Sequence, residues 1–152
     1  MGLFRKKPAD TSGQESVRPP TEFVGVTAGF QSLYEVETDD GVPVRLHDMR
    51  FLGFDYRVEP PSLTMRFVYQ DPEWTPPEAV AAPVAVYRFE GVQVWQWEDD
   101  DDLFRSPVHV RGQVDDLAYY VPTNVFELVT LNNRLMFSAD RLTVTTEPRA
   151  DG

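Results

Sequence analysis

The chain of 152 residues contains no cysteine, no isoleucine, only two lysines and only two histidines. The absence of cysteine excludes disulfides, cysteine-ligated zinc, iron–sulfur clusters and thiol nucleophiles. Two histidines, His47 and His109, are too few for a multi-histidine metal centre, and we expect no cofactor. No window approaches the roughly 18 consecutive apolar residues of a membrane-spanning helix. The basic residues near Met1 are not followed by the apolar run of a signal peptide. We therefore expect a cytoplasmic protein without a transmembrane segment.

The residues that are abundant favour β-structure. Valine, threonine and the aromatic residues number 20, 11 and 19, against 20 for alanine and leucine together. Side chains that are β-branched or aromatic pack well on a pleated, half-buried surface. The excess of valine over isoleucine and of arginine over lysine is the bias of a high-GC bacterial genome. The composition predicts a mainly β protein, and the length fits one domain.

Strict alternation of apolar and polar residues is clearest in residues 52–58, where Leu52, Phe54, Tyr56 and Val58 form one face. The same alternation returns in residues 63–69 after a Pro-Pro-Ser turn, which predicts a hairpin with one buried face. Continuous apolar character predicts central strands at residues 84–90 and 92–98. Further strands are expected at residues 34–37, 42–47, 108–114, 124–131, 134–137 and 142–146, while residues 23–33 fit a strand or a short helix.

These segments predict a single antiparallel β-sandwich or barrel-like domain of about eight or nine short strands, with at most one or two short helices. The domain is expected to span residues 23–146. Residues 1–22 are polar and rich in proline and serine, which predicts a disordered N-terminal tail. Residues 147–152 are expected to form a short polar C-terminal tail.

Negative charge is concentrated on the predicted domain. The chain has a formal net charge of −11, and residues 23–146 alone contain nine bases and 20 acids. Binding to a phosphate backbone depends on lysine and arginine, so direct nucleic-acid binding is not expected. Another protein with a basic surface is the expected partner.

The longest acidic run is Glu98, Asp99, Asp100, Asp101 and Asp102. It lacks the alternate spacing, the glycine and the terminal glutamate of a calcium-binding loop. A solvated loop, a patch that contacts a basic partner and a cation site all remain open for this run. Asp115 and Asp116 form a second candidate patch for partner binding.

Three tryptophans are candidate partner-binding residues. Trp95 and Trp97 share one face of the strand expected at residues 92–98, with Tyr87 and Phe89 in phase on the preceding strand. Such aromatic residues serve either as core or as interface anchors. Trp74 lies in a proline-rich loop, residues 70–83, and is a better candidate for an exposed anchor than the other two.

The pair His47 and Asp48 has two structural interpretations. It is either a local turn pair or, with His109, part of a site with two histidines and one carboxylate. The chain has no Gly-x-Ser-x-Gly motif and no glycine-rich phosphate loop. We therefore expect no catalytic residues and no enzyme, with a small hydrolase that uses paired carboxylates as the less favoured alternative.

Three parts of the sequence resemble a pattern in small bacterial immunity proteins of polymorphic toxin systems. They are the run Leu46-His47-Asp48, the two alternating strands around the Pro-Pro-Ser turn, and the run Phe89-Glu90-Gly91-Val92. Immunity protein family 50 is the nearest of these families. The resemblance implies a non-enzymatic protein that binds and blocks a cognate toxin. The sequence therefore predicts a non-catalytic, acidic protein-binding domain of the immunity type, with a small-ligand or divalent-cation-binding β module as the alternative.

Overall fold

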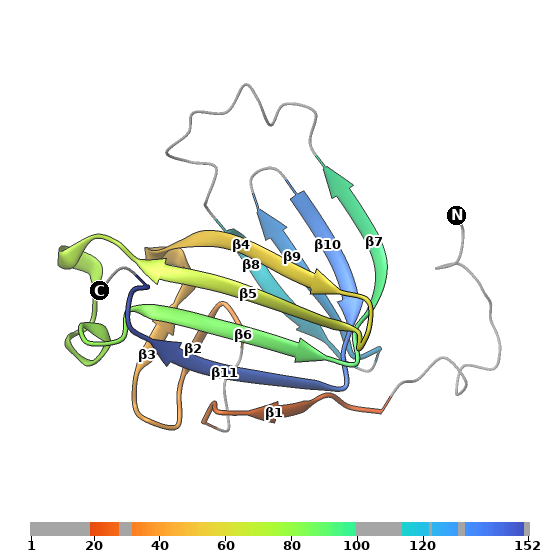
Figure 1. Ribbon diagram of the computed structural model, residues 1–152, viewed down its shortest axis with the longest axis horizontal. Coiled ribbons are helices and arrows are strands. Elements are labelled where there is room, and N and C mark those ends of the chain that lie inside the picture. Colours follow the sequence, from red (N-terminus) through yellow and green to blue (C-terminus); the bar gives the residue numbers. More distant parts are fainter. Residues whose placement is uncertain (1–18, 28–31, 100–113, 122, 131–132, 151–152) are drawn as a thin grey trace, which may run out of the picture.

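The computed structural model describes residues 19–27, 32–99, 114–121, 123–130 and 133–150. These residues form eleven strands and three short 3₁₀ helices (Figure 1). The helices are η2 (Leu46–Asp48), η3 (Pro72–Trp74) and η4 (Pro77–Ala79). The prediction of a mainly β fold is confirmed. Within the described ranges, no helix is long and apolar enough to cross a membrane.

The largest sheet has five strands in the order β1-β11-β6-β5-β4. They are β1 (Glu22–Val24), β11 (Arg141–Glu147), β6 (Val84–Glu90), β5 (Ser62–Tyr69) and β4 (Met49–Arg57). Neighbouring strands are antiparallel except that β1 runs parallel to β11. The expected hairpin of two alternating strands is the pair β4 and β5.

A second sheet has four strands in the order β7-β10-β9-β8, and a two-stranded hairpin stands apart from it. The strands of this sheet are β7 (Gln93–Asp99), β10 (Asn133–Ser138), β9 (Val125–Thr130) and β8 (Val114–Tyr120), and the hairpin consists of β2 (Glu35–Glu37) and β3 (Pro43–Arg45). Each sheet is open and has two edge strands, so the barrel-like alternative is wrong.

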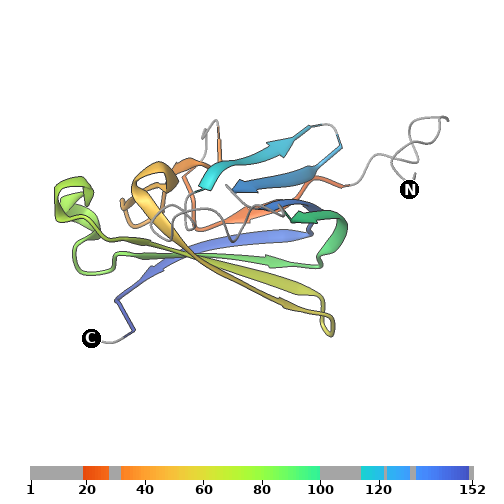
Figure 2. The same cartoon turned by 90° about the horizontal axis from the view of Figure 1, so that it is seen from above.

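The two larger sheets form separate layers, with β8, β9 and β10 above β4, β5, β6 and β11 in Figure 2. Their strands cross at a steep angle in Figure 1. Aromatic side chains join the layers: the ring of Phe89 on β6 lies 5.1 Å from that of Phe126 on β9 and 4.8 Å from that of Phe137 on β10, measured between centroids. One cluster of buried residues runs from this centre to Val36 and Val44 of the β2–β3 hairpin.

A β-bulge changes which residues of β4 face the core. The register shifts between Phe51 and Gly53, and this leaves Leu52 as the extra residue. Beyond the shift, Phe54 pairs with Met65, which is fully buried, so Phe54 faces inward and Leu52 is exposed. The predicted placement of Leu52 on the apolar face is therefore wrong, because an inserted residue interrupts the two-residue period.

The two strands expected to be central differ in position. β6 lies between β11 and β5, as predicted, but β7 is an edge strand of the other sheet. Gly91, with φ +69°, lies in the turn that passes the chain from one sheet to the other. Tyr87 and Phe89 therefore do not lie on a strand that pairs with Trp95 and Trp97.

Strand β8 begins where one predicted strand ends. Of the strand expected at residues 108–114, only Val114 lies within the described residues, and from there β8 continues to Tyr120. It passes through Asp115 and Asp116, where the register shifts by one residue. Aspartate is depleted in strands, which is why the sequence did not indicate this element.

The two ends of the chain are only partly described. Residues 1–18 and 151–152, on which most of the expected tails fall, lie outside the described residues. Thr21 is buried, and its Oγ1 donates a hydrogen bond of 2.7 Å to the carbonyl of Ala139. Glu22 begins β1 and Glu147 ends β11, so both residues are part of the sheet rather than of a tail. In the ambiguous segment 23–33, Phe23 lies in a strand.

Candidate functional site

The outer face of the four-stranded sheet brings together acidic residues from its two edge strands. Glu98 on β7 is opposite Arg134, Arg134 is opposite Val129, and Val129 is opposite Asp116 on β8. The next pairing row consists of Leu135, Leu128 and Leu117, which are buried in the core. Because successive side chains of a strand point to opposite faces, the four side chains of the first row lie on the outer face. Three strand spacings separate Glu98 from Asp116, or about 14 Å.

A carboxylate that is nearly buried lies at the centre of this face. Glu127 on β9 is only 9% exposed. Its Oε1 accepts a hydrogen bond of 2.7 Å from the hydroxyl of Tyr120, and its Oε2 accepts one from Nε of Arg134. The hydrogen bond to Glu127, more than burial, raises the pKa of Tyr120, and the same carboxylate raises the pKa of Arg134. These two partners hold the Glu127 carboxylate in one position.

At the β8 edge, the charges of three further carboxylates act on one phenol, that of Tyr34. The hydroxyl of Tyr34 donates a hydrogen bond of 3.1 Å to the carbonyl of Val114. Burial raises the pKa of Tyr34, and the negative charges of Asp115, Asp116 and Asp48 raise it further. The predicted patch of Asp115 and Asp116 therefore lies beside the His47 and Asp48 pair, although the two are far apart in the sequence.

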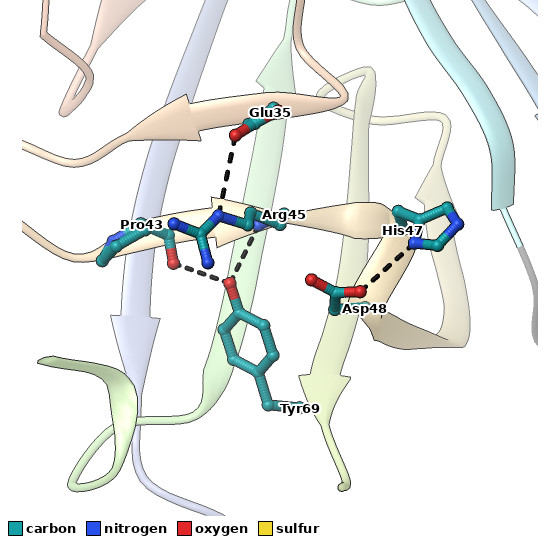
Figure 3. Close-up of polar contacts among 6 residues, drawn as sticks. All are labelled: Glu35, Pro43, Arg45, His47, Asp48 and Tyr69. Carbon is teal, nitrogen blue, oxygen red and sulfur yellow. Dashed lines mark hydrogen bonds and ion pairs between the residues drawn. The ribbon is translucent and has the colours of Figure 1, made fainter. Parts of the chain in front are cut away.

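His47 and Asp48 form a local pair within η2, as Figure 3 shows. Nδ1 of His47 lies 3.2 Å from Oδ1 of Asp48, and the imidazole is exposed. The ring of Tyr34 lies edge-on to the imidazole at 6.4 Å between centroids. His109, the other expected member of a metal site, lies outside the described residues.

The β2–β3 hairpin is attached to this region through Tyr69 of β5 (Figure 3). The Tyr69 hydroxyl accepts a hydrogen bond of 2.9 Å from the backbone N–H of Arg45 and donates one of 2.7 Å to the carbonyl of Pro43. Nε of Arg45 lies 3.6 Å from Oε2 of Glu35. Burial raises the pKa of Tyr69, and the charges of Asp48 and Glu35 contribute in the same direction. Glu35 and Asp48 therefore act on the same side chain.

Pairing rows and charge interactions relate carboxylates from five elements, which we name together the acidic belt. Its members are Glu35, Asp48, Asp115, Asp116, Glu127 and Glu98. The cations within it are Arg45, which pairs with Glu35, and Arg134, which pairs with Glu127. The belt is therefore strongly negative.

The outer face of the five-stranded sheet has the opposite character. Each of its carboxylates pairs with an arginine: Glu22 and Glu90 with Arg141 at 3.0 and 3.2 Å, Asp55 with Arg57 at 3.3 Å, and Glu147 with Arg66 at 3.7 Å. Arg50 and Arg88 lie on the same face, and neither has an ion pair within the described ranges. We name this surface the arginine face. Among the described residues, the excess of negative charge therefore lies off this face.

The candidate residues of the acidic run are only partly described. Glu98 is exposed on β7, and Asp99 is the last residue of that strand. Asp100, Asp101 and Asp102 lie outside the described residues.

The three tryptophans lie in different environments. Trp74 is 57% exposed on η3, in the loop between β5 and β6. A bulge falls between Gln96 and Val94, so the alternation expected for Trp95 and Trp97 is broken. Trp97 lies opposite Leu135 and contacts Phe54 of the other sheet, whereas Nε1 of Trp95 donates a hydrogen bond of 3.2 Å to Ser138 of its own sheet.

Sequence reasoning missed several members of the belt, including Glu35, Glu127 and the partners Tyr34, Tyr120 and Arg134. One signal for Glu127 was present, because a single carboxylate interrupts the otherwise apolar run of residues 125–129. A charged residue in a strand that is buried on both faces needs a partner. The partners themselves lie on neighbouring elements that the sequence does not identify.

Among the residues that the structure describes, no three histidine, aspartate or glutamate side chains are grouped so that they could hold a metal ion. No protein-family model, no curated protein and no solved structure matches the chain.

Proposed function

We propose that this chain is a non-catalytic, cytoplasmic protein-binding domain, a β-sandwich whose acidic belt binds a basic partner and covers that partner's working surface. Immunity-type inhibition of a cognate toxin is the form of this activity that we favour. The observation that carries the proposal is the outer face of the four-stranded sheet, where Glu98 and Asp116 lie in one pairing row, on a molecule whose other large face pairs its carboxylates with arginines.

The belt suits rapid binding of a positively charged protein. A surface of one sign steers an oppositely charged partner and raises the rate of association. The Glu127 carboxylate is held by Tyr120 and Arg134, so little side-chain freedom is lost there when a partner binds. A toxin that cleaves nucleic acid needs a basic cleft for phosphates, and such a cleft is complementary to this belt.

The first experiment is site-specific photo-cross-linking of the full chain in its native host. A photo-reactive residue at position 116 is expected to capture a basic protein, and one at position 88, on the arginine face, is not. Capture of the same protein from both positions, or of an acidic protein from position 116, would contradict the proposal.

The second experiment measures the association rate with the captured protein as a function of salt. Replacing Asp115 and Asp116 by asparagine is expected to lower this rate about tenfold at low salt and to flatten its salt dependence. The matched control replaces Glu73 and Glu78, two exposed carboxylates of the η3–η4 loop, by glutamine. Both variants remove two negative charges, so equal effects would mean that net charge rather than the belt is responsible.

A further inference from the structure

Apolar side chains are exposed where the edge strands β4 and β7 meet. The rings of Phe54 and Trp97 extend from opposite sheets and lie edge to face, 5.1 Å apart between centroids. Tyr56 follows on the same face of β4, opposite the buried Leu63, and Val58 lies in the turn after β4. In Figure 1 this region lies at the right, where β7 passes the end of β4. We name Phe54, Tyr56, Val58 and Trp97 the edge patch.

The edge patch is apolar surface that the sheets themselves do not cover. Tyr56, Val58 and Trp97 are 39%, 73% and 47% exposed, whereas Leu63, the pairing partner of Tyr56, is 1% exposed. Contiguous exposed apolar residues at the rim of a core are typical of a protein-binding surface. Both edge strands contain a bulge, which disfavours pairing with an added strand. A partner would therefore bind here through side chains rather than by extending a sheet.

Charge selects the kind of partner. Glu98, the last member of the acidic belt, directly follows Trp97, and the exposed Glu59 directly follows Val58. The nearby Arg57 is already paired with Asp55. A second copy of the chain would bring another net charge of −11 to this rim, and like charges oppose that association.

We propose that the edge patch receives an apolar side chain of the basic partner, one flanked by lysine or arginine residues that contact Glu98 and Glu59. This inference rests on the proposed function and adds the anchor that charge alone does not supply. Interfaces derive most of their affinity from a few apolar or aromatic anchors, while charged residues mainly set the rate and the choice of partner.

The test uses two labelled lysine-rich peptides and the full chain, with binding measured by fluorescence polarisation. One peptide has Leu-Phe at its centre and the other has Ser-Ser. The Leu-Phe peptide is expected to bind about tenfold more tightly. The double variant Tyr56→Ser with Val58→Ser is expected to abolish that difference, while the control Val80→Ser, at a position 68% exposed on the far loop, preserves it.

Equal binding of the two peptides to the unmodified chain would overturn the inference. So would a double variant that still binds the Leu-Phe peptide more tightly than the Ser-Ser peptide. If the double variant does not fold, Val58→Ser alone decides, because that side chain is the most exposed of the patch. The Ser-Ser peptide lacks the apolar anchor, so its binding depends only on charge. If the edge-patch inference fails, loss of Ser-Ser peptide binding in the Asp115→Asn, Asp116→Asn variant would still support the proposed function.

Two further measurements distinguish the basic partner from two other occupants of the edge patch. Sedimentation that shows a dimer, which is lost in the double variant, would assign the edge patch to a second copy and overturn the inference. Tight binding of a labelled peptide with the sequence of residues 1–18, which contains Leu3, Phe4 and four basic residues, would assign the edge patch to the chain's own N-terminal segment and would also overturn the inference.

Discussion

Tyr34, Tyr69 and Tyr87 each direct a hydroxyl to a main-chain carbonyl on another element. Tyr87 is completely buried, and its hydroxyl donates a hydrogen bond of 3.0 Å to the carbonyl of Leu33. The bonds of Tyr69 and Tyr34 hold the β2–β3 hairpin and the start of β8 in the same way. A buried hydroxyl that lacked such a partner would be costly, so these bonds fix segments that have few backbone partners of their own.

The buried phenol of Tyr87 predicts a loss of stability at alkaline pH. Burial raises its pKa well above the ordinary value of 10.0, so above that pH the unfolded chain releases a proton that the folded chain retains. The contribution of Tyr87 to the free energy of unfolding is fully present below about pH 10 and falls by about 1.4 kcal/mol per pH unit above it. Urea unfolding from about pH 8 to about pH 11 should therefore show a shallower decline for Tyr87→Phe than for the unmodified chain.

Tyr87→Phe should also lower the free energy of unfolding by about 1 to 2 kcal/mol at neutral pH, since the carbonyl of Leu33 loses its hydrogen-bond donor. An identical alkaline decline in both proteins would show that Tyr87 does not retain its proton in the folded state.

At the scale of elements, the two large sheets use arginine differently on their outer faces. Arg134 on β10 neutralises Glu127, which is nearly buried, whereas Arg66 on β5 pairs with Glu147, whose side chain is 47% exposed. Removal of a partner is costly when the remaining charge is buried, and it is nearly neutral when water can replace the partner.

Arg134→Ala is therefore expected to lower the free energy of unfolding by about 1 to 3 kcal/mol, and Arg66→Ala by less than about 1 kcal/mol. Chemical denaturation of both variants makes the comparison. A further variant, Arg134→Ala with Glu127→Gln, should recover part of the loss because it removes the unpaired charge. Equal losses for the two single variants would contradict the distinction.

The sequence predicted most of the strands but not the irregularities within them. The β4–β5 hairpin and the later strands β9, β10 and β11 coincide with segments chosen for composition and alternation. It did not predict the bulges at Leu52 and Trp95, because an extra residue in a strand has no compositional signal. It also did not predict that β6 and β7 separate into different sheets, since the same short turn at Gly91 fits a hairpin equally well.

The candidate site was predictable only in its components. Glu98, Asp115 and Asp116 were identifiable as acidic patches from the sequence. Their relation was not, because it depends on β10 and β9 lying between β7 and β8. The neighbouring position of Asp48 likewise results from the packing of η2 beside β8, which no local pattern specifies.

For the whole molecule, the concentration of negative charge in the acidic belt favours partner binding but lowers the stability of the fold. Asp48, Asp115 and Asp116 all act on Tyr34, and within the described ranges no arginine or lysine pairs with any of the three. Like charges that act on the same side chain also repel one another, and salt screens that repulsion. A surface arranged for binding is commonly less stable than it could be.

Stability should therefore rise by several tenths of a kcal/mol as NaCl increases from about 20 to about 200 mM. Asp116→Asn should raise stability at low salt and reduce the further gain from NaCl, while Glu78→Gln, on the exposed η4, should change neither. Thermal unfolding at the two salt concentrations measures this effect. A decrease in stability with salt would show that ion pairs on the arginine face outweigh repulsion along the belt.

The parallel pairing of β1 with β11 also bears on how the protein is synthesised. Glu22 and Arg141 are 119 positions apart, yet they are register partners and form an ion pair. A ribosome releases β1 before the other described strands and β11 after them, and β11 must insert between β1 and β6. A chain that terminates before Arg141 therefore loses two strands rather than one, and it leaves the backbone edge of β6 unpaired. Incomplete translation products of this protein are thus expected to be prone to aggregation and to proteolysis.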